Sequence, residues 1–397
     1  MQTPSKEATS AVTASALVQR ARDLVPVLRQ RAAQTEADRM VPRETVADFQ
    51  AAGLFRILQP KAYGGYEMDP QVFYDVAMTL AEGCMSSAWI YGIIGVHAWQ
   101  LALFDPRAAA DVWGKDSATL VASTYMPKGQ VKPAEGGFRF SGRWGFSSGI
   151  DHCDWVLLGG LIFNEGQPPE YRTFLLPRSD FEVVDTWYTM GLKGTGSKDI
   201  VVKDVFVPEY RTHKATDGFM GTNPGRETFT APLYKMPFGQ IFVRAVSSAA
   251  IGSLQGALTA FREFAAVRVG DMGNKTSEQA PAQLAAAEVS VAIDEMKLVL
   301  NRNFDRLMAA AREGRQLDVN ERLHFRFQAS QVVDRCARHA YQLFSACGGR
   351  GIFSDFALVR HFMDIHAARG HYANNPEQFG RNFGGVLLGR DNTDYFI

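Results

Sequence analysis

The run from Ser141 to Gly149 reads Ser-Gly-Arg-Trp-Gly-Phe-Ser-Ser-Gly and combines residue types that could hold a planar ring. Trp144 offers a ring face, Ser147 and Ser148 offer hydroxyl groups, and the glycines let a flat ligand approach the backbone closely. The same residues also suit a plain β-hairpin with a hydrogen-bonded serine pair, and spacing by itself favours that simpler interpretation. A ring-binding strand therefore needs support from other segments of the chain.

Histidine and cysteine are common metal ligands, and their spacing here predicts no metal site. His366 and His371 are five residues apart, which misses the separation of four that places two ligands on one helical face. The cysteines contain no Cys-x-x-Cys pair. We expect all of them to be buried thiols in a reducing compartment, namely Cys84, Cys153, Cys336 and Cys347.

A second glycine-rich run, Gly348-Gly349-Arg350-Gly351, superficially resembles a dinucleotide-binding motif. That motif requires a strand before the glycines and a helix after them. The residues before Gly348 have the periodicity of a helix instead. We therefore find no unit in this sequence that would bind a nicotinamide cofactor.

The composition limits which classes of protein the chain can belong to. With 397 residues, of which 46% are hydrophobic, it can bury a large core in more than one packed domain. Its 42 basic and 42 acidic residues balance, and no basic run is interleaved with aromatics, so we expect no nucleic-acid partner. We also find no signal peptide between Met1 and Thr13 and expect no membrane-spanning run, which predicts a cytoplasmic protein.

Hydrophobic periodicity places helices at both ends of the sequence and strands between them. Leu17, Ala21, Leu24 and Leu28 have the spacing of an amphipathic helix over residues 14–33. Further helices are predicted at 42–53, 70–83, 238–269, 281–312 and 320–346. Near Ser117 the pattern changes to short apolar runs, at 155–158, 173–176 and 200–207, which indicates a small β domain.

Several segments taken together resemble the acyl-CoA dehydrogenase fold, and the resemblance covers essentially the whole chain. They follow the serine-rich strand in order, as Asp151-His152, Gly191–Ser197, Val205–Pro208, Ala346–Gly351 and Phe362–His366. Such a fold implies a mostly α protein with an N-terminal helical domain (residues 1–116), a central β-barrel (117–230), and a C-terminal four-helix bundle with a tail (231–397). It also implies a flavin between the domains and a homotetramer.

Other segments narrow the resemblance to the oxygenase components of two-component (group D) flavin-dependent monooxygenases. Gly95-Val96-His97, Leu101–Phe104 and Trp187-Tyr188 are similar to the pattern of the p-hydroxyphenylacetate and seco-steroid phenol hydroxylases, and Tyr234–Pro237 favours the second. The resemblance implies that a separate NAD(P)H:flavin reductase supplies FMNH2 or FADH2. With O2 this cofactor would form a C4a-hydroperoxyflavin, which hydroxylates a small aromatic, phenolic substrate.

The resemblance assigns substrate roles to His97 and Ser123. His97 matches a histidine that contacts the phenol hydroxyl, where an imidazole that titrates near neutral pH could draw off the phenolic proton and make the ortho carbon more nucleophilic. Ser123 matches a serine beside the substrate. From spacing alone, His97 would be a hydrogen-bonded core histidine and Ser123 an ordinary hydroxyl at the start of a strand.

The resemblance also assigns residues to the flavin. Ser148 matches a serine near N5, where a hydroxyl could hold the proton that would otherwise help to expel peroxide. His371 matches a histidine beside C4a, whose cationic or donor imidazole would stabilise the peroxide anion; a helix C-terminal cap after Gly370 is the simpler alternative. The remaining predicted cofactor contacts are Trp144, Ser147, Thr195, Ser197, Arg268, Gly348 and Gly349. Arg268 would bind phosphate or be a solvated charge at a helix end, and the two glycines would approach a flavin tail, often a neighbouring subunit's.

Two departures from related patterns bear on the reaction and the substrate. Acyl-CoA dehydrogenases need a carboxylate base near the flavin, whereas Arg369–Asn375 offers His371, which weakens dehydrogenation without excluding it. The p-hydroxyphenylacetate enzyme has an arginine where this chain has Gly239, which favours a larger or less charged aromatic substrate. Two other functions stay open: an FAD-dependent acyl-CoA dehydrogenase or nitroalkane-oxidase-like enzyme, and a catalytically silent helical assembly protein.

Overall fold

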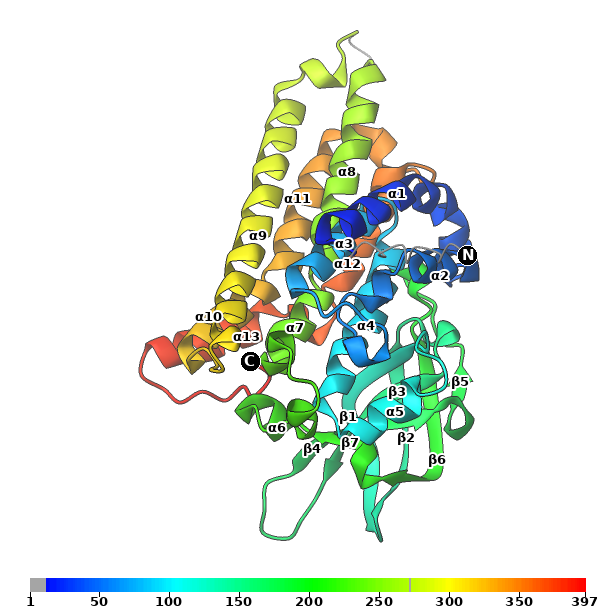
Figure 1. Ribbon diagram of the computed structural model, residues 1–397. Coiled ribbons are helices and arrows are strands. Elements are labelled where there is room, and N and C mark those ends of the chain that lie inside the picture. Colours follow the sequence, from blue (N-terminus) through cyan, green and yellow to red (C-terminus); the bar gives the residue numbers. More distant parts are fainter. Residues whose placement is uncertain (1–11, 271–272) are drawn as a thin grey trace, which may run out of the picture.

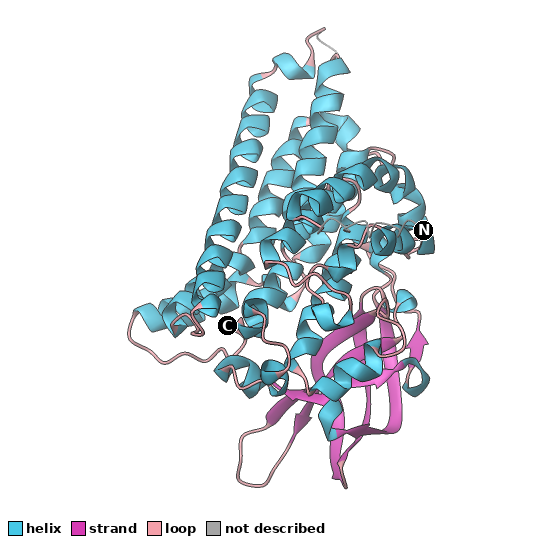
Figure 2. Ribbon diagram, viewed as in Figure 1, coloured by secondary structure: helices cyan, strands magenta, loops and turns pink. Residues whose placement is uncertain are grey.

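The first part of the chain is helical, as the periodicity predicts (Figures 1 and 2). The structure is a computed structural model that describes residues 12–270 and 273–397. Its first helices are α1 (Ala14–Ala37), α2 (Arg43–Ala51), α3 (Pro70–Ala81), α4 (Met85–Gln100) and α5 (Pro106–Trp113). Helix α1 begins after Thr13, whose side chain accepts a hydrogen bond from the backbone N–H of Ala16.

Helix α4 lies at the centre of this region because it has no polar face. Every residue from Met85 to Gln100 is buried, and a helix that is apolar on all sides must be enclosed by other elements. It is contacted by helix α3, by helices α7 (Phe238–Ala245) and α8 (Ser248–Val267), and by strand β1 (Val121–Ala134). Trp89 and His97, which are eight residues apart and therefore close to one face of α4, are thus held in the interior.

Strands of the middle region form one seven-stranded sheet in the part of the chain that the structure describes. They are β1 (Val121–Ala134), β2 (Gly137–Ser147), β3 (Trp155–Ile162), β4 (Glu170–Pro177), β5 (Glu182–Val184), β6 (Lys198–Pro208) and β7 (Thr212–Lys214). Their order is β5-β6-β2-β1-β3-β4-β7. Strands β1 and β3 run parallel, and the other neighbours run antiparallel.

The predicted barrel is observed as an open but strongly curled sheet. No ladder joins the edge strands β5 and β7 in the described residues, and each edge strand has only three residues with which to pair. The curl brings strands β2 and β4 face to face, since the rings of Phe140 and Phe174 stack at 4.3 Å although two strands separate them. The core of the β domain lies inside this curl.

The rest of the chain is again helical. Its helices are α6 (Ala215–Met220), α7 (Phe238–Ala245), α8 (Ser248–Val267), α9 (Ala280–Arg312), α10 (Val319–Ser330), α11 (Val332–Ala346), α12 (Ala357–Ala368) and α13 (Pro376–Leu387). Short 3-10 helices connect many elements; η6 (Lys193–Thr195), η11 (Gly348–Ile352) and η12 (Tyr372–Asn374) matter below. Helices α8, α9, α11 and α12 pack together as a four-helix bundle, with its far end directed away from the sheet (Figure 1).

Two of the predicted long helices are interrupted. The block predicted at 238–269 breaks between α7 and α8, where the side-chain amide of Asn374 donates to the carbonyl of Val246 at 3.0 Å. The block predicted at 320–346 breaks after Ser330, whose hydroxyl donates to the carbonyl of Phe327 at 2.8 Å. A side-chain donor that hydrogen-bonds to a backbone carbonyl competes with the helical N–H for that acceptor. Hydrophobic periodicity in the sequence does not reveal such a bond.

One segment, Phe238–Val267, is long and apolar enough to cross a membrane by length and composition, contrary to the expectation that no such run exists. In the structure 94% of its most apolar window is buried inside the protein. Burial of this extent is what the core helix of a bundle requires.

Candidate functional site

Three hydroxyl groups form a hydrogen-bonded chain where β2 meets the loop before β6. The Oγ of Ser148 lies 2.7 Å from the Oγ of Ser197, which lies 2.6 Å from the Oγ1 of Thr195. Thr195 donates its proton to the carbonyl of Leu192 at 2.9 Å, so Ser197 donates to Thr195 and Ser148 donates to Ser197. The indole N–H of Trp89 donates to Ser148 at 3.3 Å. Ser148 therefore keeps one free acceptor position and no free proton.

The backbone just before Ser148 is irregular. Phe146 has a φ of 66°, a left-handed conformation that is uncommon for a residue with a side chain, and the pairing of β2 with β6 shifts between Trp144 and Ser147. Phe146 turns outward and is 65% exposed, whereas Ser147 and Ser148 are both buried. The hydroxyl of Ser147 has no hydrogen-bond partner among the described residues. The irregularity thus presents two adjacent hydroxyls to the interior, which a regular strand cannot do.

Helix α12 fixes the loop that carries Thr195. Asp364 accepts a hydrogen bond from the backbone N–H of Leu192 at 2.6 Å. Gly191 lies so close to this helix that a Cβ there would come within 2.2 Å of the carbonyl oxygen of Met363. Burial raises the pKa of Asp364 to about 7. The bundle therefore positions the hydroxyl chain of the β domain.

His97, in the last turn of α4, has one ring nitrogen engaged and one free. Its Nδ1 lies 3.1 Å from Oε1 of Gln100 and 3.2 Å from the hydroxyl of Tyr125. Tyr125 donates its own proton to the same Oε1. Because a carbonyl oxygen only accepts, the network assigns the ring proton of His97 to Nδ1. Its Nε2 is then a lone-pair acceptor, buried and without a partner among the described residues.

The environment of His97 keeps its imidazole neutral. Burial lowers the pKa of His97 to about 3, with the hydrogen bond to Gln100 opposing that effect. The expectation that this residue titrates near neutral pH is therefore wrong. A neutral imidazole with a free lone pair can still accept a proton or a hydrogen bond from a substrate hydroxyl.

A cluster of rings connects His97 to the hydroxyl chain. The ring of His97 lies 6.1 Å from that of Tyr125, and Tyr125 lies 4.9 Å from Phe242. Phe242 lies 6.2 Å from His371, and His371 lies 5.9 Å from Trp89, which binds Ser148. We call these five residues the ring cluster. The structure thus brings together the three predicted catalytic residues, since the cluster contains two of them and contacts the third.

His371 is held as a neutral hydrogen-bond donor. Burial and the nearby charge of Arg326 lower the pKa of His371 to about 4. Its Nδ1 accepts a hydrogen bond from the backbone N–H of Ala373 at 3.1 Å, which places the ring proton on Nε2. Of the two forms that the sequence left open, cationic or donor, the structure supports the donor. The simpler alternative, a cap at the C-terminal end of a helix, is not observed: the C-cap of α12 is Arg369, and the hydrogen bond from Ala373 makes His371 the N-cap of η12.

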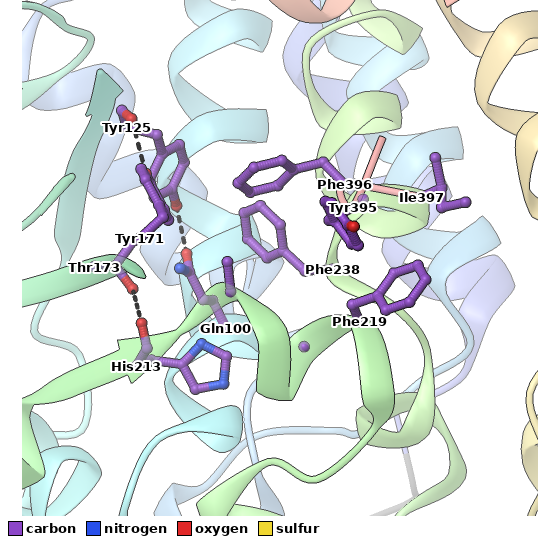
Figure 3. Close-up of a pocket in the computed structure, with 13 residues that line it drawn as sticks. Gln100, Tyr125, Tyr171, Thr173, His213, Phe219, Phe238, Tyr395, Phe396 and Ile397 are labelled. Atoms are coloured by element: carbon purple, nitrogen blue, oxygen red, sulfur yellow. Dashed lines mark hydrogen bonds between the residues drawn. The ribbon is translucent and has the colours of Figure 1, made fainter. Parts of the chain in front are cut away.

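Ser123 and a small cavity lie at the Tyr125 end of the ring cluster. Ser123 is buried on β1 and lies beside the Tyr125 phenol, whose pKa burial raises well above its usual range. The cavity is lined by aromatic side chains, Tyr171 and Phe238 among them, and Figure 3 shows the hydrogen bond from Tyr125 to Gln100 at its edge. Its volume is about 20 Å³, which is room for about one water molecule.

Comparison with known proteins places the chain in a family. Residues 13–107 match the N-terminal domain of acyl-CoA dehydrogenase, and residues 245–376 match its C-terminal domain. The oxygenase subunit HsaA of a flavin-dependent monooxygenase from Rhodococcus jostii is 37% identical over 96% of this chain and 100% of its own length. The chain belongs to the acyl-CoA dehydrogenase family. The predicted fold family is therefore confirmed.

Within this family the similar proteins are oxygenase components. The FADH2-dependent resorcinol hydroxylase oxygenase of a Rhizobium species is 31% identical over 94% of both chains. The p-hydroxyphenylacetate 3-hydroxylase oxygenase of Acinetobacter baumannii is 27% identical over 96% of this chain and 90% of its own.

Solved structures agree with these relatives. The 3-HSA hydroxylase of Rhodococcus superposes with a TM-score of 0.93 at 37% identity, covering 96% of this chain and 99% of its own. XiaF from Streptomyces, solved with FADH2, gives 0.87 at 25% identity, with 96% and 97% covered. The predicted kinship with flavin-dependent oxygenase components is confirmed. This member of the family is a flavin-dependent monooxygenase component that works with reduced flavin and O2.

Four predicted cofactor residues of this family member lie apart from the ring cluster. Trp144 is fully buried in the β domain, where its indole N–H donates to the carbonyls of Met126 and Gly159 at 3.1 and 2.9 Å. The side chain of Trp144 is therefore packed in the core of the β domain. Arg268 directly follows α8, Gly348 and Gly349 begin η11, and all three residues are exposed. The roles of these three residues at a flavin tail stay predictions, and for the two glycines that flavin would belong to a neighbouring subunit.

Sequence reasoning missed three residues of the ring cluster and the amide beside it. Trp89, Tyr125 and Phe242 of the cluster, and Gln100, all contact predicted residues but were not selected. Gln100 follows His97 by three positions, so a search for polar neighbours on one helical face would have found it. Phe242 and Tyr125 come from distant segments, and no local pattern links them to His97.

The cysteine side chains and the possible metal ligands were also predicted from the sequence. All four cysteines are free and buried, as the sequence predicts. Within residues 12–270 and 273–397, no group of three histidine, cysteine or carboxylate side chains lies close enough together to hold a metal ion.

Proposed function

We propose that this protein hydroxylates a phenolic ring, with His97 as the residue that accepts a hydrogen bond from the phenol hydroxyl. One observation carries the proposal: the Nε2 of His97 is buried and unpartnered within the described residues, in a neutral ring whose Nδ1 is fully engaged. An unpartnered buried acceptor is costly unless a ligand satisfies it. Relatives named as resorcinol and p-hydroxyphenylacetate hydroxylases support a phenol as that ligand.

His97 would act as a positioned base toward the phenol hydroxyl. A hydrogen bond from the phenol to Nε2 raises the electron density of the ring at the ortho carbon. If the proton transfers, the imidazolium is stabilised because Nδ1–H points at Gln100 Oε1 and at the Tyr125 hydroxyl. Ser123, beside Tyr125, would contact the substrate from strand β1.

The hydroxyl chain fits a reduced flavin. Ser148 has an acceptor position and no free proton, which suits the N–H that a reduced flavin carries at N5. The unpartnered hydroxyl of Ser147 and the side chains of Thr195 and Ser197 would complete that side of the site. When bound, reduced flavin supplies the electrons that activate O2 for transfer of one oxygen atom to the ring.

His371, Trp89 and Phe242 would protect the reaction. His371 offers a neutral Nε2–H donor to an oxygen atom near the flavin, which stabilises negative charge there. The rings of Trp89 and Phe242 flank it at 5.9 and 6.2 Å. Their apolar faces would keep water from the reacting atoms.

The proposal extends to organisation and partners. The curled sheet would be the barrel of the family, in a chain divided into residues 1–116, 117–230 and 231–397. A separate NAD(P)H:flavin reductase would supply FMNH2 or FADH2 in the cytoplasm, without membrane or nucleic acid. The protein would be a homotetramer in which Arg268 binds a flavin phosphate and Gly348 and Gly349 approach the flavin of a neighbour.

Rapid mixing tests the proposed function. The protein is loaded anaerobically with reduced FMN or FAD and mixed with oxygenated buffer, and absorbance is followed with and without a simple phenol. We expect a transient spectrum that differs from those of reduced and oxidised flavin, followed by a catechol product. Immediate flavin oxidation with hydrogen peroxide as the sole product would contradict the proposal.

A further inference from the structure

The last described residues of the chain, which we call the tail segment (389–397), return from helix α13 into the cavity beside Tyr125 (Figures 1 and 3). Leu388 at the start of this path is 86% exposed, whereas Ile397 is 1% exposed. The ring of Phe396 lies 5.6 Å from that of Tyr171 and 6.3 Å from that of Phe238. The tail segment thus inserts apolar side chains between strand β4 and helix α7.

The tail segment leaves almost no free space in the cavity. A volume of about 20 Å³ remains, which admits about one water molecule and no aromatic ring. The lining is rich in aromatic rings, its polar side chains are hydroxyl, amide and imidazole groups, and it contains no Asp, Glu, Lys or Arg side chain. This is the composition expected of a pocket for an apolar, ring-containing ligand.

Gly239 allows the tail segment to lie where it does. A Cβ at Gly239 would come within 2.0 Å of the carbonyl oxygen of Phe396. The missing side chain therefore does not by itself enlarge the pocket, because the backbone of the tail segment fills that place. The expectation that Gly239 favours a larger substrate holds only if the tail segment can move.

The tail segment is fastened by hydrogen bonds, which are neutral outside the pocket; at its end the guanidinium of Arg322 donates to the carbonyl oxygen of Ile397 at 3.5 Å. The side-chain amide of Asn382, on α13, donates to Asn392 Oδ1 at 2.9 Å. The Oδ1 of Asn382 accepts from both the backbone N–H and the hydroxyl of Thr393 at 3.0 Å. Bonds of this kind contribute about 1 kcal/mol each. A bound ligand that buries more apolar area can replace them.

We propose that the tail segment competes with the substrate for this pocket and so selects substrates by size. The inference rests on the proposed function, since it takes a phenol bound at His97 as the ligand. A phenol with a small para substituent leaves the tail segment in place. A phenol with a bulky apolar substituent must displace Phe396 and Ile397, after which the substituent occupies their position against Tyr171 and Phe238.

Binding of two phenols to the full-length protein tests the competition. Calorimetry measures the Kd of 4-methylphenol and of 4-cyclohexylphenol for the wild type, Phe396→Ala and Asn382→Ala. We expect both variants to bind 4-cyclohexylphenol about tenfold more tightly, because the competent state is populated more often, and 4-methylphenol unchanged. Asn382→Ala is decisive, since it frees the tail segment without altering the pocket lining. Asn320→Ala, an exposed asparagine on α10, is the matched control and should behave as wild type.

The outcomes separate the two proposals. If 4-cyclohexylphenol binds the same or more weakly in Asn382→Ala while 4-methylphenol is still bound and hydroxylated, the tail inference fails and the proposed function stands. If no phenol is hydroxylated by the wild type or any variant, the proposed function fails and the inference falls with it. Hydrogen exchange adds a direct measure: the amide of Phe396, bonded to Asp394 at 2.9 Å, should exchange faster with 4-cyclohexylphenol bound, and slower exchange would contradict displacement.

Discussion

At the scale of single residues, the environment of His97 turns a common side chain into a specific acceptor. Burial holds its pKa at about 3, and the engagement of Nδ1 by Gln100 and Tyr125 leaves Nε2 alone to meet a ligand. The same residue type at position 371 has the opposite tautomer, because a backbone N–H occupies its Nδ1. One neutral histidine is therefore fitted to accept a hydrogen bond and the other to donate one.

Replacing His97 by asparagine tests the acceptor role. Asparagine keeps a polar group but loses the basic nitrogen, so we expect hydroxylated product per flavin oxidised to fall about a hundredfold or more. The transient absorbance after oxygen mixing should be retained, since His97 is assigned to the substrate. His339→Asn, at a partly exposed position on α11, is the matched control. Unchanged product formation in His97→Asn would remove this residue from the mechanism.

The pH dependence of the reaction should reflect the depressed pKa. An ordinary histidine, with a pKa of about 6.5, would be largely protonated at pH 5.5 and would lose its acceptor. With a pKa of about 3, His97 stays neutral, so product per flavin oxidised should be nearly constant from pH 8 down to 5.5. An acid limb near pH 6.5 that disappears in His97→Asn would contradict this assignment.

At the scale of secondary-structure elements, the contact between α12 and the hydroxyl loop depends on Asp364. Its carboxylate accepts a hydrogen bond from the backbone N–H of Leu192. Without that acceptor the buried N–H would have no hydrogen-bond partner. We expect Asp364→Ala to lower the free energy of unfolding by about 1–3 kcal/mol and to weaken flavin binding. Asp364→Asn keeps an acceptor oxygen and should retain most of both.

The contribution of Asp364 to thermal stability should also depend on pH. The pKa of Asp364 is raised to about 7 in the folded protein, so between pH 4 and 7 the folded state holds a proton that the unfolded state releases. Stability from this group is present at low pH and is lost as the pH rises through 7. The wild type should therefore lose thermal stability relative to Asp364→Asn between pH 5 and 8, and parallel melting curves would contradict the shift.

How much the sequence could predict differs between regular and irregular elements. The order of helices and strands follows from periodicity, and His97, Ser148 and His371 follow from motif resemblance. The hydroxyl chain depends on a positive φ at Phe146 and on a contact with α12, neither of which has a local signal. The tail segment packs on residues more than a hundred positions earlier, so no periodicity could place it.

At the scale of the whole molecule, one surface of the bundle is not covered by any of the described residues. Helix α9 exposes Leu284, Val291 and Leu298, each by 59–61%. These residues are seven positions apart, so they form one apolar stripe along the helix. Exposed apolar stripes on long helices favour contact with another helix. The stripe supports the proposed homotetramer and lies in the same bundle as Arg268 and the loop that contains Gly348.

Charge placed in this stripe should break the assembly and weaken flavin binding together. Val291→Glu would bury a carboxylate in a subunit interface, which costs several kcal/mol, so sedimentation should shift from tetramers to smaller species. Because Gly348 and Gly349 would then no longer approach the flavin of a neighbouring subunit, affinity for reduced flavin should fall about tenfold or more, while far-ultraviolet circular dichroism stays the same. Ser290→Glu adds the same charge at the next exposed position of α9 and is the matched control. Intact tetramers with wild-type flavin affinity in Val291→Glu would show that this stripe is not the subunit contact.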